Sequence, residues 1–157
     1  MIDQSLFRQV MGRFASGVTV VTTASGTRLA GLTVSSFASL SLEPPLVLIC
    51  IDRQAGSHAA IAEAGQFAVN ILSEGQEYLS RRFASDEPNK FTAGTYQLSS
   101  RGLPLINGAL AQIECTLHSA LPGGDHTIYV GAVVAAQCTN QRPLLYYRSG
   151  YHTLGGY

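Results

Sequence analysis

Hydrophobic and polar residues follow two different periodic patterns along the chain. Near the N-terminus, apolar residues recur every three or four positions, which predicts a helix over residues 3–14, capped by Asp3 and lying against a sheet. From Gly17 onward, runs of β-branched and apolar residues predict strands instead. The predicted strands cover residues 18–23, 28–37, 46–51, 67–72, 109–121, 127–138 and 143–147.

Two short helices are predicted between these strands. Ser57 is placed to cap a helix over residues 58–64, which Gly65 ends. Ser73 and Gln76 form a capping-box pattern that opens a second helix, running through about Phe83. Many strands with few helices predict a mainly β fold, a barrel or a sandwich. No repeat or linker marks a second domain, so residues 1–157 are predicted to form one domain.

Residues 84–108 form the longest weakly patterned stretch of the chain. Loops of that length in compact domains are usually functional or mobile. The stretch is therefore a candidate to fold over a ligand.

Composition narrows the classes of partner. The chain is 46% hydrophobic and only 13% charged, which favours burial of part of its surface in a homodimer. Ten basic residues balance ten acidic ones, and Lys90 is the only lysine, so no basic stripe indicates nucleic-acid binding. There is no leader-like N-terminus and no apolar run near the roughly 20 residues of a membrane span. We expect a cytoplasmic protein with no membrane partner.

The three cysteines, Cys50, Cys115 and Cys138, are odd in number, widely spaced and set in apolar runs. Such a pattern predicts buried thiols rather than a disulfide framework or a metal knuckle. The four histidines are dispersed, so no metal site is expected.

The segment 31–57 carries the chain's most informative chemistry. Thr33, Ser35 and Ser36 offer hydroxyls, and an apolar strand follows them. Arg53 then precedes the predicted helix that begins after Ser57, and a cation beside a helix N-terminus can bind phosphate. Each feature alone also fits a polar edge strand, a solvated turn or an ordinary cap. Together they suit a planar, phosphorylated cofactor, and the GxGxxG, GxxxxGK and HExxH motifs are absent.

The chain resembles the short-chain flavin reductase family, which supplies reduced flavin to two-component monooxygenases. The resemblance covers nearly the whole chain and rests on the order and spacing of several motifs. They are FASGVTVVTT at 14–23, the Ser-Phe and Pro-Pro elements within 31–48, Asp52-Arg53, FAVNIL at 67–72, residues 79–84, Gly124-Asp125-His126 and LLYYR at 144–148.

This resemblance implies a split β-barrel that forms a homodimer and holds FMN or FAD non-covalently in a groove near the subunit interface. The implied flavin contacts are Thr33, Val34, Ser35, Ser36, Asp52, Arg53, Gln54, Ser57, Phe83, Ala84, Lys90 and Phe91. The implied nicotinamide-side residues are His126, Tyr147, Arg148, Ser149 and Tyr151. Asn89-Lys90-Phe91 departs from the Asp-Arg-Phe form that is usual in the family.

The implied reaction is hydride transfer from NADH, preferred over NADPH, to the flavin, which then passes to a separate oxygenase. The cofactor carries this chemistry, and His126 is the candidate catalytic residue, either positioning the nicotinamide carboxamide or relaying a proton. Three alternatives stay open. They are a flavin-binding module without reductase activity, an oxidase of pyridoxine phosphate on a related barrel, and a purely structural interaction protein.

Overall fold

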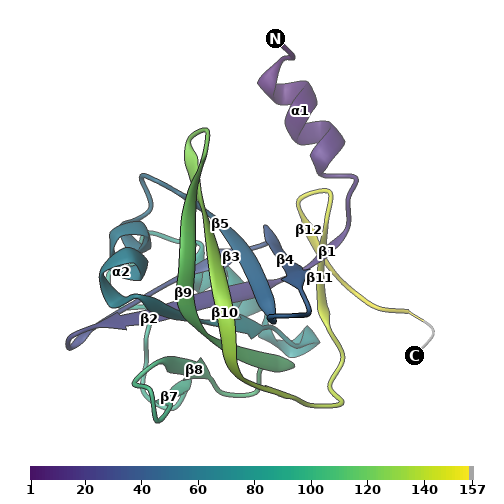
Figure 1. The fold of residues 1–157 in the computed structure, drawn as a ribbon. Coiled ribbons are helices and arrows are strands. Elements are labelled where there is room, and N and C mark those ends of the chain that lie inside the picture. The colour runs from purple at the N-terminus through teal and green to yellow at the C-terminus, as the bar shows by residue number, and fades with distance from the viewer. Residues whose placement is uncertain (156–157) are drawn as a thin grey trace.

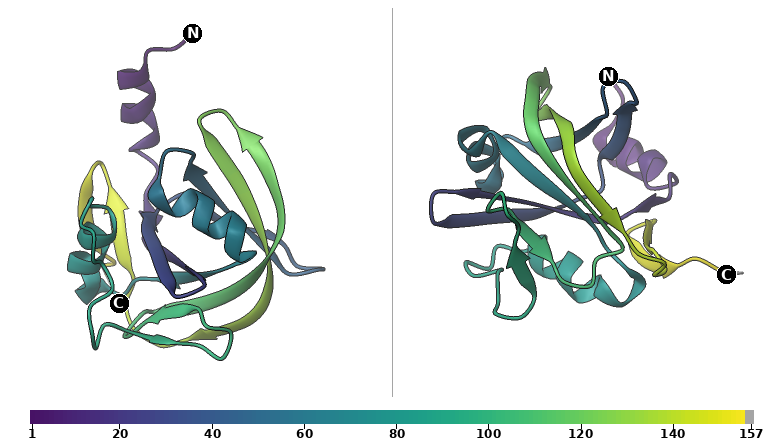
Figure 2. Two further views of the ribbon diagram at one scale, coloured as in Figure 1. Left: turned by 90° about the vertical axis from the view of Figure 1, so that its left-hand side faces the viewer. Right: turned by 60° about the horizontal axis from the view of Figure 1, so that its bottom comes forward.

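The computed structural model describes residues 1–155 and is dominated by one curved antiparallel sheet. Its strand order is β3-β2-β6-β9-β10-β5-β4, so β3 and β4 are the two edges. The strands are β2 (Thr19–Ser25), β3 (Arg28–Val34), β4 (Phe37–Ser41), β5 (Leu46–Asp52), β6 (Gln66–Ile71), β9 (Ala111–Gly123) and β10 (His126–Cys138). Figures 1 and 2 show this sheet curling around α2 (Gly56–Ala64). The predicted mainly β, split-barrel architecture is confirmed.

Two smaller sheets flank the large one. The first joins β1 (Ser16–Gly17), β11 (Leu144–Tyr147) and β12 (Gly150–Thr153) in the order β1-β11-β12. The second pairs β7 (Tyr96–Leu98) with β8 (Pro104–Ile106), within the stretch predicted as an unpatterned loop. These strands are only three residues long, too short for an alternating pattern to identify them.

The predicted strand over residues 28–37 is in fact two strands. β3 ends at Val34 and β4 begins at Phe37. The Ser36 hydroxyl donates a hydrogen bond to the Cys50 carbonyl at 2.9 Å, and the Cys50 N–H donates to the Ser36 carbonyl at 3.2 Å. The chain therefore leaves one edge of the sheet and joins the other edge beside β5.

The helices follow the predicted order, with one correction to their caps. α2 begins at Gly56, and its N-cap is Ala55 rather than Ser57. Ser57 instead occupies the second helical position and is buried. Gly65 ends the helix in the left-handed conformation at φ 65°, as the sequence predicts.

The capping box is confirmed. The Ser73 and Gln76 side chains exchange the expected bonds with the backbone around the 3-10 turn η1 (Glu74–Gln76), which leads into α3 (Glu77–Phe83). No helix among residues 1–155 is both long and apolar enough to cross a bilayer.

Helix α1 (Gln4–Met11) does not lie against the sheet, contrary to the sequence-based expectation. Asp3 caps it as predicted, accepting from the Leu6 N–H at 3.0 Å. Figure 1 shows the helix projecting away from the barrel, and all its residues are exposed. Its apolar stripe therefore has no partner within the described chain. The large apolar side chains left exposed in and after α1 are Leu6, Phe7, Val10, Met11 and Phe14.

The cysteines also differ from expectation. Cys115 is buried, and burial raises the pKa of its thiol to about 12. Cys50 is only half-buried and Cys138 is exposed, because the end of β10 extends beyond the core. All three are free thiols.

Among the glycines of residues 1–155, Gly131 on β10 has the least space for a side chain. The strand is irregular beside this residue, where the register to β9 shifts between Val130 and Gly131. A Cβ atom at Gly131 would lie 2.5 Å from Cζ of Phe67 and 2.7 Å from Cβ of Cys115, both fully buried. Neither neighbour has space to move away.

Gly131→Ala is expected to destabilise the protein by about 1–3 kcal/mol, the usual cost of overpacking a core. Urea unfolding followed by circular dichroism measures the change. The control is Gly17→Ala on β1, where a Cβ atom would meet nothing within 4 Å. Equal stability of the two variants would contradict this account of the core.

Candidate functional site

The candidate site lies along β3, the edge strand whose outer side has no partner strand in the large sheet. Two cavities follow one another there. Residues 28–31 line the larger, of about 400 Å³, and Thr33 with Ser35 line the smaller, of about 200 Å³. The consecutive residues Ala84 and Ser85 line the smaller and the larger cavity respectively. The two cavities therefore lie next to each other along the strand, and together they are called the trough below.

A hydrogen-bonded frame holds the smaller cavity open. The Thr33 hydroxyl donates to the Ser80 carbonyl at 2.6 Å, which ties β3 to α3. The buried Ser80 hydroxyl contacts the Tyr151 hydroxyl at 2.6 Å, which ties α3 to β12. Tyr146 and Tyr151 pack edge to face with ring centroids 5.3 Å apart. The wall facing Thr33 is thus aromatic and rigid.

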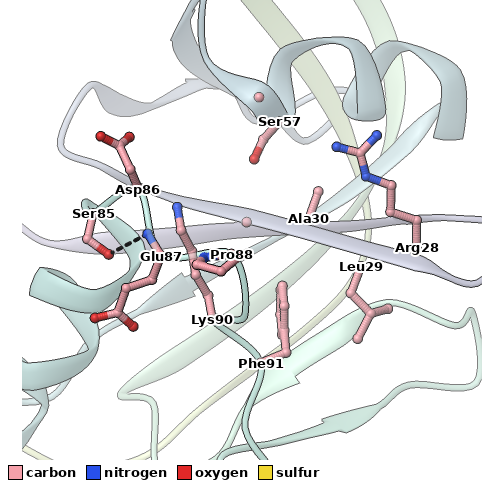
Figure 3. A pocket seen from close by; sticks show the side chains of 12 residues that line it. Arg28, Leu29, Ala30, Ser57, Ser85, Asp86, Glu87, Pro88, Lys90 and Phe91 are labelled. Atoms are coloured by element: carbon pink, nitrogen blue, oxygen red, sulfur yellow. Dashed lines mark hydrogen bonds between the residues drawn. The ribbon is translucent and has the colours of Figure 1, made fainter.

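The larger cavity is polar and has cations at its centre and at one end. Figure 3 shows the Ser57 hydroxyl directed into the space between the Lys90 ammonium and the Arg28 guanidinium. The carboxylates of Asp86 and Glu87 lie on the side away from Arg28 in the same view. This arrangement leaves the central and Arg28 portions of the cavity suited to anions.

The N-terminus of α2 opens onto this cavity through Gly56 and Ser57. No side chain caps this helix. The first N–H groups of a helix carry a partial positive charge and bind anions, phosphate above all. The helix N-terminus, Ser57 and Lys90 thus line one cavity and form a candidate anion site, whereas Arg53, the cation expected from the sequence, does not line it.

The glycine at position 31 brings β3 and α3 into contact. A Cβ atom there would lie 2.9 Å from Cε1 of Phe83 and 3.1 Å from Cζ of Phe91. Phe83 and Phe91 pack edge to face, with centroids 5.1 Å apart. The Lys90 ammonium donates to the Phe83 carbonyl at 3.3 Å. The packing of Phe83 on Gly31 therefore also determines where the Lys90 side chain lies.

His126 lies at the start of β10, directly opposite Asp52 at the end of β5. Its Nδ1 is 2.7 Å from Oδ1 of Asp125. The hydrogen bond from His126, and then its charge, hold the pKa of Asp125 below its usual range. An ionised carboxylate only accepts, so Nδ1 donates and Nε2 is left for another partner.

Arg53 belongs to the same corner as His126. Its N–H donates to the Asp125 carbonyl at 3.1 Å, and its charge contributes to the lowered pKa of Asp125. The Gln54 N–H donates to the Asp52 carboxylate at 2.8 Å. Asp52, Arg53 and Gln54 are exposed and do not line either cavity.

The remaining predicted residues lie in other places. Val34 is buried in the main core and lines neither cavity. Tyr147 is half-buried, and Arg148 and Ser149 form the β11–β12 turn with φ of 51° and 62°. Figures 1 and 2 show this turn and the β9–β10 tip, next to His126, on different sides of the molecule. One protomer therefore does not bring the predicted nicotinamide-side residues together.

Sequence reasoning missed several lining residues. Arg28 sits at a hairpin end, where an exposed charge is ordinary, and Asp86 and Glu87 belong to a stretch without pattern. Ser80 and Tyr146 also line the trough, yet nothing in their spacing indicates a site. Only the folded chain brings them beside β3.

The chain was compared with known proteins and families. The model of the flavin reductase like domain matches residues 11–155. The chain belongs to this family. The reductase subunit HsaB of a flavin-dependent monooxygenase of Mycobacterium tuberculosis is 45% identical over 153 residues, covering 96% of this chain and 82% of HsaB.

Solved structures of family members have the same fold. The flavin reductase PheA2 is 40% identical, with a TM-score of 0.92 and coverage of 98% of this chain and 99% of PheA2. The NADH:FAD oxidoreductase SgcE6 of Streptomyces globisporus, in complex with NAD and FAD fragments, is 38% identical. Its TM-score is 0.94, with coverage of 98% of this chain and 94% of SgcE6.

Proposed function

We propose that this protein is an NAD(P)H-dependent flavin reductase that transfers a hydride from NADH to a non-covalently held flavin. The observation that carries the proposal is the trough along β3, with an aromatic-walled cavity at one end and a cationic cavity at the other. A flavin has the matching form, a planar ring joined to a phosphate by a flexible chain. Family membership and the relatives named reductases support the same activity.

The ring belongs in the smaller cavity, between Thr33 and Ser35 on one side and Tyr151 on the other. When bound, the flavin itself supplies the hydride-accepting atom. The protein's task is to hold the two reactants at near-attack distance and to direct dipoles at the ring edge where negative charge grows. The Thr33 and Ser36 hydroxyls already donate to the Ser80 and Cys50 carbonyls, so the Ser35 hydroxyl, which lines the same cavity, is the candidate donor of this segment.

His126 is proposed to act on the nicotinamide side. Because Asp125 occupies Nδ1, the neutral imidazole presents Nε2 as an acceptor, which fits the N–H groups of a carboxamide. A protonated imidazole would instead present Nε2 as a donor. The acceptor would position the nicotinamide carboxamide, whereas the donor would relay a proton to the reduced flavin.

A homodimer would complete the site. The β11–β12 turn and His126 lie apart in one protomer, so a second copy is the natural source of the missing wall. α1 offers an uncovered apolar stripe for such an interface. Its C-terminal end is joined to that turn, since the Arg148 N–H donates to the Gly12 carbonyl at 3.0 Å. Docking of α1 would thus also fix Tyr147, Arg148 and Ser149.

The reduced flavin is proposed to leave and supply a separate oxygenase. Relatives named as reductase subunits or components of monooxygenases support this role. The trough is open along the barrel edge, which is consistent with exchange of the flavin. A cytoplasmic location fits a role of this kind.

The activity is tested by following NADH absorbance at 340 nm. The wild-type protein should oxidise NADH only when flavin is present, with balanced conversion of NADH, flavin and a proton to NAD⁺ and reduced flavin. His126→Ala should slow flavin reduction or raise the KM for NADH while flavin affinity stays within about twofold. No turnover with either NADH or NADPH would reject the reductase and favour a flavin-binding module.

Flavin affinity tests which cation binds the phosphate. Lys90→Gln should weaken flavin binding by roughly tenfold or more, because a hydrogen bond to a charged group contributes about 1.5–3 kcal/mol. If Arg53 bound the phosphate, as the sequence suggests, Arg53→Gln should weaken flavin binding by the same factor. Because Arg53 does not line the cavity, we expect its flavin affinity to change by less than about twofold. Fluorescence titration of both variants decides between Lys90 and Arg53.

The oligomer is tested by light scattering after gel filtration. The wild-type protein should have twice the mass of its chain. Val10→Glu in the apolar stripe of α1 should shift it towards the monomer, because an unpaired charge cannot be buried at low cost. Gln9→Glu adds the same charge on the polar face of α1 and should leave the dimer intact. A monomeric wild type would contradict the proposal.

A further inference from the structure

The larger cavity extends farther from the ring cavity than one phosphate requires. Its two cations lie at different distances along β3. Lys90 is near the junction, since its ammonium bonds the Phe83 carbonyl and Ala84 already lines the ring cavity. Arg28 is at the far end, five residues from Thr33, which is about 17 Å along an extended strand.

A mononucleotide flavin cannot span that distance. Its ribityl chain joins the ring to the phosphate through about seven single bonds, and a zigzag of bonds near 1.5 Å reaches roughly 9 Å. With its ring beside Thr33, its phosphate would arrive near Gly31, where Lys90, Ser57 and the α2 N-terminus converge. Arg28 lies about three residues, or 10 Å, beyond that point.

The surroundings of Arg28 leave its guanidinium available to bind an anion. Its side chain is exposed, and the structure gives it no ion pair within residues 1–155. Figure 3 shows its guanidinium at the edge of the cavity beside Ser57, with the carboxylates of Asp86 and Glu87 on the other side. A guanidinium binds phosphate oxygens in a bidentate manner, which favours a diphosphate that reaches it.

We propose that Arg28 makes this protein select a flavin dinucleotide, FAD, over FMN, by binding the second phosphate at the far end of the larger cavity. Lys90 and Ser57 bind the first phosphate, which both flavins carry. The adenosine half then continues past Arg28 towards the turn that closes the β2–β3 hairpin. The inference rests on the proposed flavin site.

Titration of the full-length protein with FAD and with FMN tests the inference. The wild type should bind FAD at least fivefold more tightly than FMN. Arg28→Gln should remove most of that preference. Its affinity for FAD should fall at least fivefold, while its affinity for FMN changes less than twofold. Arg28→Lys keeps the charge and should retain part of the preference.

The matched control is Arg101→Gln, which removes the same charge from an exposed arginine that bonds Thr116 and lines neither cavity. It should bind both flavins as the wild type does. Equal losses for FAD and FMN in Arg28→Gln, or no loss for either, would overturn the role of Arg28 while leaving the flavin site standing. A wild type that binds neither flavin would instead overturn the proposed function, and this inference with it.

Discussion

The site depends on one contact, the packing of Phe83 against the backbone of Gly31. Because Gly31 has no Cβ, the end of α3 approaches the edge strand more closely than any other residue would allow. That approach sets the position of Ala84 in the ring cavity and of Phe91 beside the larger one. It also fixes the position of the Phe83 carbonyl, which accepts a hydrogen bond from the Lys90 ammonium. The trough is therefore a consequence of core packing, and its polar groups are held by apolar contacts.

The edge position of β3 matters for a second reason. A sheet edge exposes backbone groups that invite pairing with another strand, and proteins normally cover or disrupt such edges. Here the stretch after α3 and the N-terminus of α2 lie across the edge without pairing with it, and the space left between them is the cavity. Residues 84–91, which belong to the stretch that the sequence marks as a candidate to fold over a ligand, form one side of the candidate site.

The two halves of the proposed mechanism are structurally unequal. The proposed flavin residues Thr33, Ser57 and Lys90 line two neighbouring cavities of one protomer. The nicotinamide half is divided between His126 at the β9–β10 tip and the β11–β12 turn, which lie on different sides. The exposed stripe of α1 and its bond to the same turn fit that division.

The sequence by itself determined the local elements and the family. Most strands of the large sheet, the Gly65 helix end, the Ser73–Gln76 capping box and the hydroxyl-rich segment at 33–36 follow from patterns spanning a few residues. Tertiary structure alone decided that α1 leaves the sheet, that Ser57 lies inside α2, and that Lys90 rather than Arg53 lines the cavity with Arg28. The reason is physical: a pattern reports which face of an element is apolar, but not which distant element will cover it. Residues at a hairpin end or in an unpatterned stretch acquire a shared site only when packing brings them together.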